Sequence, residues 1–448
     1  MKVMKINWLP LAAAVAFAAG SVSASAVDFH GYFRSGMQAS ARGGDVFCGG
    51  DGTAGHKVGR LGDECDTYAE MALGQEVYNK NSRKFNVNTR LAYGTVQSDD
   101  GHDSQWNDWQ SYGNKGDGSA DGWGGGRTAI REFWGNYVTD DYTLWAGKRF
   151  YQRKDIHIWD IYTLSTAGYG AGIEGIDVGN GNLNFAVMKN TSDNKGTSYR
   201  NNYNLDLRWN AISLGSFGSL DAVAIYGIPM VSDYQADNYG FSKNSGVLLT
   251  LDHTLNVDTL MNHFIVQWGN NGFSDVGAFG SNGTNIYTSG KDINGVRLVD
   301  WGTYDINDFT LAYGLFWGYI AQGNKAEGSW SRSNSGWEYS LTVRPEYKWT
   351  EYTRTTLELG YSQKKNGTNK LDDKGKPAWD RYDNGNPDIY KVTLAQQFTP
   401  GKGFWSRPAI RFYASYQGGD QFKHKVGDAK LDNHNFQFSF GTQVEAWW

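Results

Sequence analysis

The side chains best suited to chemistry lie close together, between Arg149 and Tyr162. This segment mixes cations, carboxylates, imidazole and aromatic rings, and it follows an expected strand over Thr143 to Gly147. Asp155 and Asp160 could form the acid and base pair of a glycoside hydrolase. Mixed charges beside aromatic rings also line the narrow part of selective channels. Because nothing else in the sequence indicates a buried catalytic pocket, we expect an inward-folded loop that narrows a pore, no enzyme and no cofactor.

The elements that must hold this segment are strands, because apolar and polar residues alternate strictly along the chain. From Trp337 to Trp349 every second residue is apolar, and the residues between them are all polar. Aromatic residues stand at both ends of the apolar face, as in a strand that crosses two membrane interfaces. The C-terminal segment from Phe436 to Trp448 follows a similar pattern.

Composition narrows the fold class further. The 448 residues include 18 Trp, 27 Tyr and 22 Phe but only 7 Pro, which excludes a disordered or collagen-like chain. The net charge of −5 gives no reason to expect a nucleic-acid partner. The mean hydropathy is negative, which fits a barrel with a wet, polar interior better than a soluble fold with a large apolar core. We therefore predict an all-β, transmembrane antiparallel barrel.

The connections between the expected strands support this prediction. Short breaks alternate with long polar stretches, an arrangement typical of outer-membrane barrels. The long stretches are 98–126, 190–202, 269–291 and 364–387. A strand count in the high teens fits the chain length, and nothing splits residues 27–448 into separate domains.

The first 26 residues are typical of a cleaved signal peptide. Lys2 and Lys5 precede an apolar stretch, and Ala24 to Ala26 forms a small-residue cleavage site. The protein is therefore expected to be exported. In an exported chain, Cys48 and Cys65 are expected to form a disulfide, with a redox or metal-binding pair as the alternative.

Four aromatic residues depart from the alternation and are expected to face the lumen. Each stands an even number of positions from polar residues of the same expected strand and therefore shares their parity and their face. These residues are Tyr32, Tyr68, Trp405 and Trp447. Each lies near a charged residue on the same face, such as Arg34 or Glu70. A pyranose ring has an apolar face and a rim of hydroxyls, so this combination suits a sugar. The alternative is that these rings simply pack beneath inward-folded loops.

The chain resembles the maltoporin family of outer-membrane channels of Gram-negative bacteria. The resemblance spans the mature chain and rests on the runs VDFHGYFRSG, RLGDECDTYAEMALGQEV, WAGKRFYQRKDIHIWDIY, LTVRPEYKWT, YKVTLAQQF, WSRPAIRFYASY and GTQVEAWW. It implies a homotrimer of 18-stranded barrels in the outer membrane, each conducting maltose and maltodextrins.

The resemblance also implies roles for individual residues. An aromatic slide would comprise Tyr32, Tyr68, Trp405 and Trp447, with Met261 at the last position, where the family has an aromatic residue. Trp123, or instead Trp106 or Trp109, would reach the channel mouth of a neighbouring subunit. A polar track around the constriction would comprise Arg34, Arg60, Glu70, Arg131, Arg153, Asp155, His157, Asp160 and Tyr162. The alternative for these charges is a salt-bridge network that only sets the width and electrostatics of the pore.

Two other functions stay open at this point. A channel for sucrose or β-glucosides would share the same barrel. A secreted carbohydrate-binding protein would instead be found soluble in the periplasm or the medium.

Overall fold

A computed structural model describes most of the chain after the expected signal peptide. The described residues are 27–43, 46, 57–64, 66–96, 110–111, 127–191, 201–239, 243–278, 292–321, 335–365, 388–419 and 436–448. The expected signal peptide, both cysteines and the three candidate loop tryptophans Trp106, Trp109 and Trp123 lie outside these residues. The domain boundary, the disulfide and the role of the loop tryptophan therefore stay predictions.

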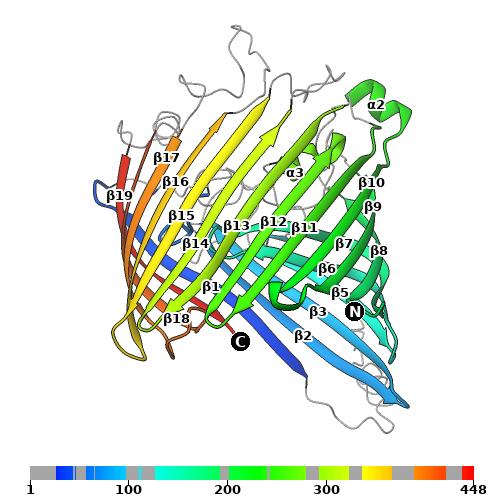
Figure 1. The fold of residues 1–448 in the computed structure, drawn as a ribbon, viewed down its shortest axis with the longest axis horizontal. Helices are drawn as coiled ribbons and strands as arrows, with labels where there is room; N and C mark the ends of the chain where they lie inside the picture. Colours follow the sequence, from blue (N-terminus) through cyan, green and yellow to red (C-terminus); the bar gives the residue numbers. More distant parts are fainter. Residues whose placement is uncertain are drawn as a thin grey trace, which may run out of the picture.

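One antiparallel sheet contains all the described strands (Figure 1). They are β1 (Asp28–Ser40), β2 (Asp66–Lys80), β3 (Arg83–Val96), β4 (Gln110–Ser111), β5 (Arg127–Val138), β6 (Thr143–Ile156), β7 (Ile161–Asp177), β8 (Asn182–Thr191), β9 (Asn201–Ser213), β10 (Ser219–Pro229), β11 (Gly246–Val257), β12 (Leu260–Asn270), β13 (Asn294–Ile306), β14 (Phe309–Ile320), β15 (Gly336–Lys348), β16 (Thr353–Lys365), β17 (Asp388–Phe398), β18 (Ala409–Gly418) and β19 (Phe436–Trp447). The short helices are η2 (Gly215–Phe217), α2 (Asp233–Tyr239), η3 (Asn271–Phe273) and α3 (Ser274–Ala278). Among the described helices, none is both long enough and apolar enough to cross a membrane.

The sheet closes on itself. Each long strand pairs with its neighbours in sequence, and β1 pairs with both β2 and β19. The backbones of Gly31 and Trp448 exchange two hydrogen bonds of 3.2 Å where the ends of the chain meet. β4 has two residues and pairs only with β5, so eighteen long strands make up the described wall. The prediction of a closed antiparallel barrel is confirmed.

Short turns and long connections alternate around the barrel. β2 and β3 are joined by Asn81 and Ser82 alone, and β11 and β12 by Asp258 and Thr259. At the opposite end, β16 is separated from β17 by residues 366–387. In outer-membrane barrels the short turns face the periplasm, which orients this molecule.

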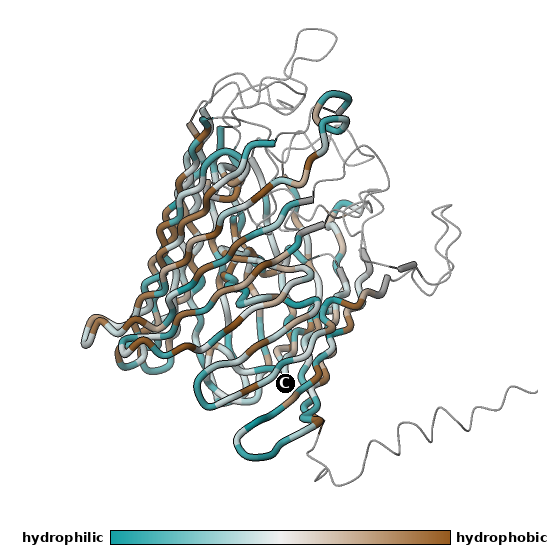
Figure 2. Tube along the Cα trace, turned by 90° about the vertical axis from the view of Figure 1, so that its right-hand side faces the viewer, coloured by the Kyte–Doolittle hydropathy of each residue, from teal (hydrophilic) through white to brown (hydrophobic). Residues whose placement is uncertain are grey.

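The two faces of the wall are inverted relative to a soluble protein. In β15, Glu338, Thr342 and Arg344 are buried on the inner side, whereas Tyr339 and Leu341 are 40% and 44% exposed on the outer side. Figure 2 shows apolar and polar residues alternating along the strands. An apolar exterior around a polar interior is the arrangement that a lipid bilayer requires, as the alternation predicted.

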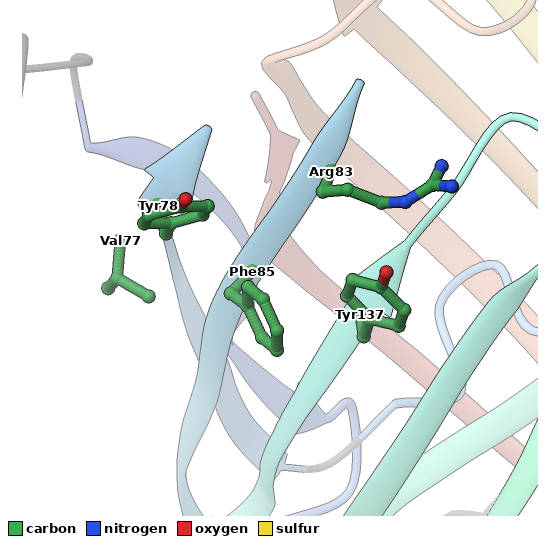
Figure 3. Close-up of a pocket in the computed structure, with 5 residues that line it drawn as sticks. All are labelled: Val77, Tyr78, Arg83, Phe85 and Tyr137. Carbon is green, nitrogen blue, oxygen red and sulfur yellow. The ribbon is translucent and has the colours of Figure 1, made fainter. Parts of the chain in front are cut away.

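An aromatic groove marks the outer wall near the β2–β3 turn (Figure 3). Val77, Tyr78, Phe85 and Tyr137 line it together with Arg83. The rings of Tyr78 and Phe85 are 5.9 Å apart, and those of Phe85 and Tyr137 are 4.8 Å apart. Exposed aromatic residues at a strand end form the interfacial girdle of such barrels, so we assign this groove to lipid contact rather than to the channel.

A segment between β1 and β2, residues 57–64, lies against the inner wall of β15 to β18. The Lys57 Nζ is 2.8 Å from Glu338, and the backbone N–H of Leu61 donates to Glu358 at 3.0 Å. Gly360 allows this approach, because a Cβ atom there would stand 1.9 Å from the carbonyl oxygen of Val58. The segment thickens one side of the wall and carries Arg60 into the lumen.

The hairpin tip of β6 and β7 occupies the lumen from the other side. β6 pairs with β5 only up to Lys148, and β7 pairs with β8 only from Tyr169. Between these points the two strands pair with each other alone and turn at residues 157–160. The expected inward-folded segment is therefore mostly a β-hairpin, because its strands continue past Gly147 to a tight turn.

An apolar cluster anchors the hairpin tip to the wall. It contains Ile156, Ile158, Trp159 and Ile161 of the hairpin with Ile265, Val299, Trp301, Ala312, Phe316 and Phe404. The Trp159 indole N–H donates to Thr342 Oγ1 at 2.8 Å. Its ring lies over Gly314, where a Cβ atom would stand 2.6 Å from the ring. These contacts hold the hairpin tip in one place.

We predict that Glu358→Gln destabilises the barrel. The buried Glu358 carboxylate pairs with Arg344 and, at 3.0 Å, with the Lys391 Nζ. Removing its charge leaves two buried cations uncompensated, which costs about 3–5 kcal/mol in buried ion pairs. The unfolding temperature in detergent should fall. The lipid-facing neighbour Leu359→Val is the matched control, and an equal unfolding temperature in both variants would contradict the prediction.

Candidate functional site

Four aromatic side chains form a row along the lumen. Tyr68 in β2 and Tyr32 in β1 have ring centroids 6.2 Å apart. Tyr32 is the cross-strand partner of Trp447 in β19. The Trp447 ring is 6.3 Å from that of Trp405, which lies in the short β17–β18 connection. The structure thus brings together the four aromatics that parity places inside.

The imidazole of His157, at the hairpin turn, packs against the lower end of this row. Its ring centroid is 5.1 Å from that of Trp405 and 5.7 Å from that of Trp447. Its Nδ1 is 3.0 Å from Arg60, and its Nε2 is 3.3 Å from Arg407. His157 therefore fixes the hairpin turn against the aromatic row.

Charged groups alternate in sign beside Tyr32. The guanidinium of Arg34 donates to Glu64 at 3.0 Å and to Asp160 at 2.6 Å. Arg60 donates to Tyr32 at 2.9 Å and to Glu64 at 2.7 Å, and it is 3.1 Å from Glu445. This network joins β1, the 57–64 segment, the hairpin turn and β19.

A second charged group surrounds Tyr68. Its hydroxyl donates to Glu70, which also accepts from Arg90 at 2.7 Å. The guanidinium carbons of Arg153 and Arg131 lie 4.6 and 5.2 Å from the centroid of the Phe150 ring. Arg153 also lies 4.6 Å from the centroid of Tyr162. The predicted track residues around Tyr68 are therefore close neighbours.

Two predicted residues have different surroundings. Asp155 is exposed on the hairpin and is the cross-strand partner of Tyr162. Met261 is the second residue of β12, just after a short turn, and packs against the hairpin-anchoring cluster rather than beside the four aromatic rings. It lies at the periplasmic end of the barrel, consistent with a last position along the channel.

Sequence reasoning missed several members of the charge network. The Glu445 carboxylate forms ion pairs with Arg60, Arg407 and Arg411, the last two at 2.9 and 2.8 Å. Glu64 bridges Arg34 and Arg60. Parity places Glu445 on the inner face, which is a usable signal. No local pattern indicates that Glu64 folds into the lumen.

The electrostatics of the hairpin turn fix two protonation states. Burial, reinforced by the guanidinium of Arg60, holds the pKa of His157 well below its usual range. Burial disfavours the charged form of Asp160, but Arg34 and Arg60 outweigh it and hold the Asp160 pKa below its usual range. An ionised Asp160 is the form that pairs with Arg34 at 2.6 Å.

Comparison with known protein families gives the same picture. The model of the LamB porin family matches residues 27–448. The chain belongs to the LamB porin family. It is a membrane-embedded channel protein of the Gram-negative outer membrane.

Solved structures of low sequence identity share the architecture of this porin. OccAB1 of Acinetobacter baumannii has a TM-score of 0.50 and 11% identity over 95% of this chain and 98% of its own. OccAB2 of the same organism has a TM-score of 0.49 and 9% identity, over 94% of this chain and 98% of its own. The first likeness supports the fold alone.

The lumen of this porin presents two kinds of surface to a solute. The ring row presents apolar faces at successive depths, and the adjacent Arg and Glu side chains present donors and acceptors. The charges are already paired with one another, so a hydroxyl gains little from any single one. Such shallow, repeated contacts permit passage, because conduction requires that every bound position can be left.

We predict that Tyr162→Ala raises the ion conductance of this porin. The Tyr162 ring supports the Arg153 guanidinium on the inward-folded hairpin, so truncating the ring removes bulk from the lumen and frees the cation. Single-channel recording in a planar bilayer measures the change, and sugar discrimination should weaken in parallel. An unchanged conductance would place the narrowest point elsewhere.

We also predict that His157 contributes to acid sensitivity. Since the folded-state pKa is depressed, the unfolded chain binds a proton that the folded porin resists as the pH falls through about 6.5. The stability that neutral His157 provides is therefore present above this pH and lost below it. Between about pH 7 and about pH 5, the unfolding temperature should fall more for the unmodified porin than for His157→Gln. Equal falls would refute the prediction.

Proposed function

We propose that this porin facilitates passive diffusion of maltose and linear maltodextrins into the periplasm. The observation that carries the proposal is the row of Tyr68, Tyr32, Trp447 and Trp405 along the lumen, in which Tyr32 and Trp447 are cross-strand partners. A glucan chain has apolar pyranose faces that stack on such rings. No chemical step is needed, and the sugar moves down its concentration gradient.

The polar track supplies the second half of the mechanism. Arg34, Arg60 and Glu70 lie beside the rings and are held by neighbouring charges. As a sugar advances, its hydroxyls exchange hydrogen bonds with these groups while part of its hydration is lost. Because each residue is pre-oriented, a passing sugar orders few side chains, and each site is easily left.

Other features of the proposal follow from the resemblance to maltoporins. The working unit would be a homotrimer, with a Trp123 from one subunit at the channel mouth of the next. Residues 1–26 would be removed on export, and Cys48 would pair with Cys65. A heat-modifiable trimer on a detergent gel would support the assembly.

A channel for sucrose or a β-glucoside is the alternative. The feature that favours this alternative is the aliphatic Met261 at the last slide position, where the family has an aromatic residue. Block of ion current in a planar bilayer separates the two, by titrating maltotriose and sucrose against the same channel. Stronger block by maltotriose supports the proposal, equal or stronger block by sucrose favours the alternative, and channels with no sugar block refute a sugar-selective function.

We predict that Trp447→Ala weakens maltotriose block without unfolding the barrel. Loss of one stacking contact of roughly 0.5–1.5 kcal/mol raises the apparent dissociation constant about two- to tenfold. Phe440→Ala is the matched control, because Phe440 lies in the same strand but is exposed on the outer wall. An unaltered maltotriose affinity in Trp447→Ala would remove Trp447 from the slide.

A further inference from the structure

The inner wall near Met261 carries a stacked pair of rings outside the aromatic row. His263 follows Met261 by two residues in β12 and shares its inward face, and its cross-strand partner in β13 is Trp301. The two ring centroids are 4.8 Å apart, and the ring planes differ by 7°. Trp301 belongs to the hairpin-anchoring cluster and is 9% exposed. His263 therefore rests on a fixed aromatic base.

Hydrogen bonds orient the imidazole. Its Nδ1 is 3.0 Å from Asp252 Oδ1 and 3.2 Å from the hydroxyl of Thr254. Asp252 is itself held by the Lys154 Nζ at 2.7 Å, and Lys154 belongs to the constriction hairpin. Since an ionised carboxylate only accepts, the hydrogen on Nδ1 points to Asp252, and in the tautomer that carries its one hydrogen there, Nε2 is left as an acceptor.

The Nε2 atom is available to a ligand. Among the described residues no hydrogen bond to it is formed, both polar contacts of the ring being made through Nδ1. Nε2 is not fully buried, and it belongs to a side chain on the inner face of β12. The side chain as a whole is 22% exposed. An oriented ring with one free acceptor is suited to binding a hydroxyl group.

The position along the channel is also specific. β12 starts directly after the short β11–β12 turn, which places Met261 and His263 at the periplasmic end of the lumen. Met261 offers no ring there. The pair of His263 and Trp301 supplies an aromatic surface two residues further along β12 from the turn. It is connected to the constriction hairpin through Asp252 and Lys154.

We propose that His263 is the exit contact of the channel, binding a glucose unit of a linear oligosaccharide as it leaves the constriction. The free Nε2 accepts a hydrogen bond from a sugar hydroxyl, and the imidazole supported by Trp301 presents a flat surface to the pyranose. Asp252 and Lys154 act as positioning residues, because they orient the imidazole without touching the sugar. This inference rests on the proposed function of the channel.

Sugar-induced current noise in single channels tests the proposal, with maltotriose added to either side of the bilayer. His263→Ala should raise the apparent dissociation constant of maltotriose roughly three- to tenfold, the loss expected for one ordinary contact. The release rate toward the short-turn side should rise most. Phe264→Ala is the matched control, because Phe264 is the next residue of the strand but is exposed on the outer wall, and it should bind maltotriose as the unmodified channel does.

The outcomes separate this proposal from the function it rests on. If the unmodified channel shows no maltotriose block, the proposed function fails and the exit contact fails with it. If the unmodified channel is blocked and His263→Ala is blocked equally, the exit contact alone is overturned. Should His263→Ala change the sugar-free conductance, His263→Phe decides, since it retains a ring on Trp301 but lacks Nε2. Weaker block in His263→Phe supports the proposal, and unchanged block overturns it.

Discussion

Closure of the strand ladder is the constraint on which the rest of this structure depends. A backbone N–H or C=O in hydrocarbon has no water to bind, so a strand that crosses a bilayer must pair on both sides. β1 meets this requirement by pairing with β2 and with β19, which joins the two ends of the barrel. Closure in turn fixes which residues face lipid, because side chains of a strand alternate between its faces. The polar half of each strand must then point inward.

Because closure turns the polar half of each strand inward, the interior contains many ion pairs. Cations such as Arg344 and Lys391 cannot remain buried without partners, and Glu358 provides one for both. The 57–64 segment and the β6–β7 hairpin add further donors and acceptors, and both are held at several points. The charged side chains of the lumen wall therefore hold one another in place as a lattice of ion pairs. Because these ion pairs hold the wall in place, the aromatic rings keep fixed positions, as the proposed series of sugar contacts requires.

The sequence was enough to predict the barrel and the inward placement of Tyr32, Tyr68 and Trp447, because both depend on parity, a local property of a strand. Trp405 lies in the β17–β18 connection, where parity does not apply. The sequence indicated an inward-folded segment after Gly147, but not that residues 57–64 also enter the lumen. Lys57 and its partner Glu338 are 281 residues apart, and no periodicity marks Lys57 as an interior residue. For the same reason Glu64 was missed. The segment was expected to be an inward-folded loop rather than a hairpin, because the partners of its charges lie on distant strands, such as Asp221 of β10 and Asp252 of β11 for Lys154.

Two histidines show how position in this lattice decides the use of a side chain. His157 has a guanidinium near each ring nitrogen and packs against two tryptophans, so it has no atom free for a ligand. His263 has an acidic partner at Nδ1 only, and the other nitrogen is open. Both rings are connected to the same hairpin. His157 lies in its turn, and His263 is linked to it through Asp252 and Lys154. A rearrangement of the hairpin would therefore move the middle of the channel and its exit together, so that pore width and sugar contact cannot vary independently.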